Sequence, residues 1–144
     1  TERRPMALWQ RQGTFVLVDR AGSPIPGQDI RRFAHLPVLT GADAPMEAAR
    51  LLAMLQGEPA LAERVRGAAR VSGRRWNVML DNGITIRLPE VQAETAWSKL
   101  AAYDRDHQVL SRDIIAIDLR FDDRLVVRVS PDAGTVRRDS GQNT

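Results

Sequence analysis

The 144-residue sequence contains no cysteine, a single lysine and only two histidines, and each shortage removes a class of function. Without cysteine, disulfides, thiolate nucleophiles and cysteine-based zinc or iron sites are excluded. No apolar run approaches the roughly 18 residues that a membrane-spanning helix needs. The length fits one compact domain. Because the chain starts at Thr1 without an initiator methionine, we expect it to be part of a longer protein.

The chain has little net charge despite being rich in arginine. Its 21 basic and 18 acidic residues leave a charge of +3, and aromatic residues make up only 5% of the sequence. Arginine doublets are interrupted by acidic residues, so nucleic-acid binding is permitted but not indicated. The alternative hypothesis is a basic nucleic-acid-binding module in which Arg74 and Arg75 contact phosphates and Trp76 stacks on bases.

Motifs that would indicate catalysis are also absent from the sequence. There is no G-x-S-x-G, no phosphate-binding glycine loop and no H-x-x-E-H pair. His35 and His107 have no carboxylate or serine at a spacing that would position a triad or a metal site. Asp122 and Asp123 are adjacent carboxylates, but a tight turn explains them better than acid–base chemistry does. We therefore expect neither an enzyme nor a cofactor.

The first half of the chain predicts two strands, an irregular loop and a helix. Residues 5–9 and 14–19 read as strands joined by a turn at 10–13. Prolines and glycines in 21–27 predict an irregular loop that continues to about Thr40. A helix should follow Asp43 as N-cap and end at Leu55 before Gly57. Residues 58–71 fit either a helix or the start of a strand, and periodicity favours the helix through most of the segment.

The second half predicts a hairpin, a helix and another hairpin. Trp76, Val78 and Leu80 alternate with Asn77 and Met79, and Ile84, Ile86 and Leu88 alternate with Thr85 and Arg87. A three-residue loop of residues 81–83, with Gly83 in the left-handed conformation, pairs the apolar residues on one face. A helix is expected over residues 90–106.

The last hairpin should repeat this arrangement around a loop of residues 122–124. That register pairs Phe121 with Leu125 and Leu119 with Val127, and it places Asp118 across from Arg128. Residues 132–144 have too little apolar content to pack, so we expect a domain over 1–131 and a flexible tail. If the final strand ends the sheet, its outer backbone is free to accept a strand from another protein.

Several segments in order resemble the FtsQ family of bacterial cell-division proteins, also called DivIB. They are ERRPMALWQ, GTFVLVDRAGSPIP, LPVLTG, RRWNVMLDNGITIRLP and IDLRFDDRLVVR, and together they run from Glu2 to Pro131. The sequence of these segments is similar to the alphaproteobacterial type. The resemblance implies an α+β domain with a mostly antiparallel sheet of roughly eight strands and at least two helices. It also implies that Val65–Val71 is a strand, and we follow the family there.

The resemblance further implies a non-enzymatic scaffold of the division machinery. Family members have a cytoplasmic tail, one inner-membrane helix, a POTRA domain and a C-terminal β domain in the periplasm, and this chain corresponds to the β domain. The implied partners are FtsB and FtsL, bound through the far edge of the sheet in support of septal cell-wall synthesis.

Carried over by position, the partner-binding segment includes the end of one strand, a loop and the last strand. In the family's arrangement, Arg120 offers a charge to an acidic partner residue and Phe121 offers an apolar contact. Some relatives have Gly at the third loop position and a Gly-Trp pair near the end of the last strand, where this chain has Arg124, Arg128 and Val129. Arg74 and Arg75 are weaker candidates. The implied partner-binding residues are Arg120, Phe121, Asp122, Asp123, Arg124, Leu125, Val126, Val127, Arg128 and Val129.

Overall fold

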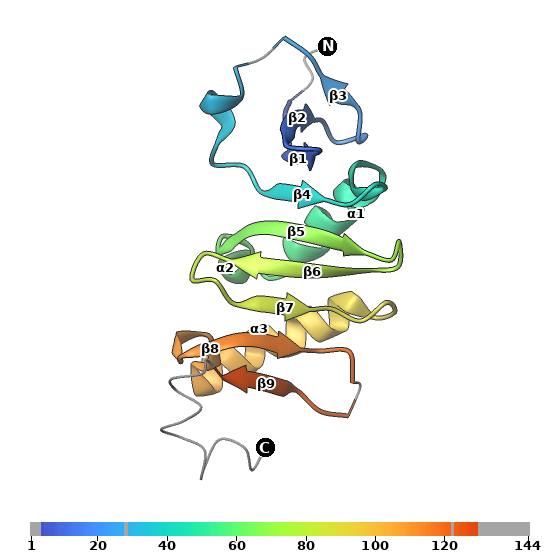
Figure 1. The fold of residues 1–144 in the computed structure, drawn as a ribbon. Helices are drawn as coiled ribbons and strands as arrows, with labels where there is room; N and C mark the ends of the chain where they lie inside the picture. Colours follow the sequence, from blue (N-terminus) through green and yellow to red (C-terminus); the bar gives the residue numbers. More distant parts are fainter. Residues whose placement is uncertain (1–3, 28, 122, 130–144) are drawn as a thin grey trace.

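A computed structural model describes residues 4–27, 29–121 and 123–129, which form one sheet with helices packed on one of its faces (Figure 1). The predicted tail at 132–144 lies outside the described residues. The strands are β1 (Ala7–Arg11), β2 (Thr14–Val18), β3 (Pro24–Ile25), β4 (Val38–Thr40), β5 (Val65–Val71), β6 (Arg75–Leu80), β7 (Thr85–Arg87), β8 (Ile114–Asp118) and β9 (Val126–Val129). The helices are α1 (Ala44–Leu55), α2 (Pro59–Ala62) and α3 (Ala93–His107), with short 3-10 turns η1 (Ile30–Phe33) and η2 (Val109–Ser111).

The strand order is β3-β2-β1-β4-β5-β6-β7-β8-β9 over the described residues. Five of the pairings in this part of the chain are antiparallel, and three, β1–β4, β4–β5 and β7–β8, are parallel. The predicted α+β class is confirmed, with nine strands and three α-helices among the described residues instead of roughly eight strands and at least two helices. Helices connect two of the parallel pairs, β4–β5 and β7–β8, whereas the chain between β1 and β4 runs through β2, β3 and η1.

The predicted first hairpin is present, with a shorter turn than expected. Arg11 pairs with Thr14, so only Gln12 and Gly13 form the turn, and both have positive φ, of 52° and 83°. Positive φ at both central positions is typical of the type I′ turn that matches the twist of a two-residue hairpin.

The predicted irregular loop up to Thr40 is wrong at its end, because β4 lies inside it. Leu8 pairs with Val38 on one side, and Val38 pairs with Gly67 on the other. Leu39, in the middle of β4, is fully buried. Three residues are too few for an alternation pattern to be recognised, so this central strand is specified by its neighbours.

The α1 helix is confirmed, and the segment after it is a strand where periodicity favoured a helix. Asp43 is the N-cap residue of α1, although its side chain does not cap the helix. Between α1 and β5, helical structure is limited to Pro59–Ala62. Val65–Val71 forms β5, as the family resemblance implied. Gly67 allows β5 to lie close to β4, because a Cβ at this position would lie 2.8 Å from the Val38 carbonyl oxygen.

The hairpin of β6 and β7 has the predicted register. Val78 pairs with Ile86, Leu80 N–H donates to the Ile84 carbonyl at 3.0 Å, and Gly83 has φ +89°. The inward side chains of this hairpin contribute to the core between the sheet and the helices.

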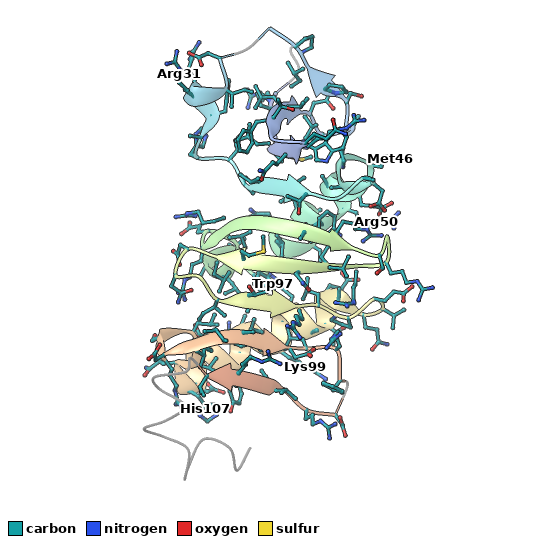
Figure 2. The ribbon with its side chains drawn as sticks, viewed as in Figure 1. Arg31, Met46, Arg50, Trp97, Lys99 and His107 are labelled. Atoms are coloured by element: carbon teal, nitrogen blue, oxygen red, sulfur yellow. The ribbon has the colours of Figure 1, made fainter. Side chains whose placement is uncertain are left out.

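The second predicted helix is present as α3, which begins three residues after the expected Glu90. Trp97 and Leu100 are buried on its inner face, and the Trp97 Nε1–H donates to the Leu55 carbonyl at 3.0 Å. This bond joins α3 to the end of α1 on the helical face of the sheet, where Trp97 and Lys99 are marked in Figure 2.

Candidate functional site at the sheet edge

The strand β9 is a terminal strand of the sheet. It pairs antiparallel with β8 and is the lowest strand in Figure 1. Within the described ranges no strand pairs with its outer side. Because backbone groups alternate in direction along a strand, β9 presents N–H and C=O groups outward that another chain could bind.

The predicted register of this last hairpin is wrong by two residues. Ile117, not Leu119, pairs with Val127, and Asp118 lies opposite Val126 instead of Arg128. The connection consequently runs over residues 119–125, and Phe121 does not pair with Leu125. Since the shift is even, Leu119 and Val127 keep the inner face that the alternation predicted. Phe121 is instead exposed, and an irregularity between Ile114 and Ala116 leaves Ile115 exposed and Ala116 buried.

The side chain of Asp118 explains the longer connection. Its Oδ1 accepts hydrogen bonds from Arg120 N–H at 3.0 Å and Arg120 Nε–H at 2.8 Å, and its Oδ2 accepts one from Arg120 Nη2 at 2.6 Å. The guanidinium of Arg87 lies 3.9 Å from the same carboxylate. With these contacts in place, the pairing with β9 ends at Asp118, and the chain turns away after Leu119. The predicted pair of Asp118 with Arg128 is thus replaced by pairs with Arg120 and Arg87.

This ion pair also shifts the titration of both partners. The hydrogen bonds from Arg120 lower the pKa of the Asp118 carboxyl more than its burial raises it. The same contact raises the pKa of the Arg120 guanidinium. Asp118 is therefore ionised and engaged throughout the physiological pH range.

An open groove of about 650 Å³ lies between α3 and residues 119–125. Three large apolar side chains on its walls are exposed: Val91 at 72%, Tyr103 at 42% and Phe121 at 40%. Lys99 and Arg124 also line the groove, which gives it cationic groups beside apolar surface. Sequence reasoning missed Val91, Lys99 and Tyr103 as site residues. The helix expected over residues 90–106 includes Lys99 and Tyr103, but helical periodicity alone does not show which of its side chains line a groove.

The remaining site residues divide between the two faces of β9. Leu125, Val127 and Val129 are half-buried against the core, whereas Val126 and Arg128 are exposed. Arg124 stacks on Phe121, with its guanidinium carbon 4.8 Å from the ring centre. Asp123 is exposed, and the predicted site residue Asp122 lies outside the described residues.

The weaker candidates Arg74 and Arg75 line a second groove, of about 460 Å³, between α1 and α3. Pro89 lines both grooves, so the two adjoin on the helical side of the sheet. Trp76 is only 7% exposed, and the Arg70 guanidinium lies 5.3 Å from its ring centre. The stacking role of Trp76 in the nucleic-acid hypothesis is therefore wrong, because its ring is buried in the core.

The reactive groups of the described residues do not converge. In those parts of the chain no cluster of three or more His, Asp or Glu side chains could hold a metal ion. His35 lines a groove with Met6 and α1, far along the sheet from β9, and His107 contacts the Tyr103 ring at the end of α3 (Figure 2).

Fold and surface together define an α+β domain with an apolar groove and, among the described residues, a terminal strand whose outer side pairs with no other strand. Residues 7–120 match the family described as "Cell division protein FtsQ/DivIB, C-terminal". The chain belongs to this family of bacterial cell-division proteins. Its members are non-enzymatic proteins of the division machinery, which agrees with the prediction that the chain is not an enzyme.

Curated relatives named cell division protein FtsQ are similar over most of this chain. The Rhizobium radiobacter protein is 39% identical over 95% of the chain, the Rhizobium meliloti protein 39% over 92%, and the Bradyrhizobium diazoefficiens protein 38% over 96%. The chain spans 65%, 43% and 41% of the length of these relatives, respectively. The expected alphaproteobacterial likeness is thus confirmed.

A solved structure of the major extracytoplasmic domain of DivIB from Geobacillus stearothermophilus aligns with 76% of this chain and 98% of its own, at 18% identity and a TM-score of 0.47. In the described part of the chain, no helix has the length and apolar character needed to cross a bilayer.

Proposed function

We propose that this domain is a non-enzymatic scaffold of the divisome that binds FtsB and FtsL by accepting a partner strand along β9. In the longer protein it is held on the periplasmic side of the inner membrane by a single membrane-spanning helix and supports septal cell-wall synthesis. The observation that carries this proposal is the outer edge of β9, which no strand in the described part of the chain pairs with, beside an apolar groove.

The backbone at the β9 edge can form hydrogen bonds with any extended segment. Main-chain hydrogen bonds to an added strand do not depend on the partner's sequence, whereas side chains next to the edge select the partner. The β9 strand has four residues, so the added ladder is short and needs side-chain contacts to give a stable complex.

The groove supplies these contacts. Phe121 lines the groove close along the chain to β9, and Val91 and Tyr103 contribute from α3 and the residues before it. An apolar partner side chain that enters the groove would remove these three exposed surfaces from water, at about 25 cal/mol per Å² of buried apolar area. Backbone pairing and one anchored side chain together define the binding mode.

Substitution of Phe121 tests the groove contact with a matched control in the same chain. Phe121→Ala should weaken binding of purified FtsB–FtsL complex by about 10-fold or more, in line with the loss of an aromatic interface anchor. Phe15, on β2 near the other end of the sheet, is also 40% exposed. Phe15→Ala removes an equally exposed ring, and we expect wild-type binding from it in isothermal titration calorimetry.

Proline substitution tests strand addition itself. Consecutive N–H groups of β9 alternate between pointing outward and pointing at β8. Because proline has no N–H, one of the substitutions Val126→Pro and Val127→Pro removes an outward donor and the other removes a donor directed at β8. Both variants should abolish binding, whereas only the variant that loses the N–H directed at β8 should also lower the unfolding midpoint. Wild-type affinity of both folded variants would contradict binding through β9.

A further inference from the structure

The two arginines that flank Phe121 differ in what they contact. Arg120 makes three hydrogen bonds to Asp118, through its backbone N–H and two guanidinium nitrogens. The Asp118 side chain is only 13% exposed, and its next cation, Arg87, is 3.9 Å away. If Arg120 turned towards a partner, it would leave a mostly buried carboxylate without its main donors, which is costly.

Arg124, in contrast, makes no hydrogen bond to a carboxylate of the described residues. It is exposed, and within the described residues its guanidinium forms no ion pair and contacts only the ring of Phe121, at 4.8 Å. It lies two residues before β9 and on the wall of the groove. A strand added to β9 would therefore pass close to a charge that nothing described neutralises.

We propose that Arg124, and not Arg120, is the residue that selects an acidic side chain on the bound partner strand, while Arg120 is a positioning residue that fixes the 119–125 connection through Asp118. This inference rests on the proposed function of the β9 edge. It reverses the role that the family resemblance gave to Arg120.

The stacking of Arg124 on Phe121 links the two contacts. In the free domain the guanidinium covers one face of the ring. A partner carboxylate that attracts the guanidinium would uncover that face for an apolar side chain entering the groove. A partner with an acidic residue near its apolar anchor satisfies both groups, whereas a basic residue at that position would be repelled.

Three glutamine variants of the full chain separate the two roles. Arg124→Gln and Arg120→Gln each remove one charge beside Phe121. Arg11→Gln is the matched control, because Arg11 stacks on Trp9 at 5.3 Å in β1, near the opposite end of the sheet. The probe is purified FtsB–FtsL complex, and its affinity is measured from about 50 to 500 mM NaCl, together with the unfolding midpoint of each variant.

Arg124→Gln should weaken binding about fivefold at the lowest salt concentration, approach wild-type affinity at the highest and leave the unfolding midpoint unchanged. Arg120→Gln should lower the unfolding midpoint and weaken binding by a factor that does not depend on salt. Arg11→Gln should bind as wild type. Neutralising the acidic residues of FtsB one at a time should reveal one whose loss has no further effect in Arg124→Gln.

The outcomes distinguish this inference from the proposed function. If the wild-type chain binds, the proline variants do not, and Arg124→Gln matches the wild type at every salt concentration, the selection by Arg124 is overturned while strand addition stands. A salt-dependent loss in Arg120→Gln with unchanged stability would overturn it as well. If the proline variants bind normally, the proposed function itself fails.

Discussion

Asp118 determines the shape of the candidate site although it does not itself line the groove. It is the last residue of β8, and its carboxylate accepts hydrogen bonds from Arg120 at the point where the strand ends. In addition, Leu119 N–H donates to the Arg87 carbonyl at 2.8 Å, so the chain follows β7 for one more residue before it turns. The position of Phe121 on the wall of the groove follows from these contacts.

Replacing Asp118 with Asn should reduce the free energy of unfolding at about pH 7 by about 1–2 kcal/mol, because charge-assisted hydrogen bonds to Arg120 become neutral ones. The pKa of Asp118 is lower in the folded chain than the ordinary value of 3.8. Its contribution is therefore complete above the unfolded pKa and is lost as the pH falls through the lower, folded pKa. Urea unfolding of wild type and Asp118→Asn should give stabilities that converge in that acid range. A stability difference that stays constant down to the lowest pH would contradict the ion-pair explanation.

At the residue scale, the sequence predicted chemistry better than it predicted contacts. The ten partner-binding residues were named from the family resemblance, and Phe121, Asp123, Arg124 and Leu125 do share one groove. What no pattern could reveal was which acidic residue each arginine contacts. Asp118 and Arg128 were matched by counting along an assumed ladder, whereas an arginine two residues away could reach the carboxylate locally.

At the element scale, alternation predicted local hairpins well and non-local strands poorly. The β6–β7 register followed from matching apolar faces across a three-residue loop. In the β8–β9 pair the same rule gave the wrong register, and the even shift kept Leu119 and Val127 on the inner face but not Phe121, which is exposed. The parallel strands β4 and β5 depend on each other, and neither carries a local signal strong enough to identify it.

Gly67 provides a test of this mutual dependence. Its Cα approaches the β4 backbone so closely that an added Cβ would lie 2.8 Å from the Val38 carbonyl oxygen. Gly67→Ala should therefore push β4 and β5 apart and reduce stability by about 1–3 kcal/mol. Chemical denaturation measures this change. If Gly67→Ala is as stable as wild type, close packing of β4 on β5 is not what this position requires.

At the scale of the whole molecule, the sheet has two ends with different chemistry. At one end β3 has two residues, one of them a proline without a backbone N–H, which limits strand addition there. At the other end β9 has four residues with no proline, next to the groove. The helices occupy a single face of the sheet in Figure 1, and among the described residues no strand pairs with the outer side of β3 or β9. The difference between the ends predicts where a partner strand is added.

Hydrogen exchange followed by mass spectrometry can compare the two ends in one experiment. When FtsB–FtsL complex is added to the full chain, backbone amides of β9 that point outward should become protected, because they gain partners in the added strand. Peptides covering residues 119–125 should also exchange more slowly, since a filled groove restricts that connection. Peptides covering β1, β2 and β3 should exchange as in the free chain. Protection of β3 with an unchanged β9 would place the partner at the opposite end of the sheet, and Phe15→Ala, not Phe121→Ala, would then be the variant that loses binding.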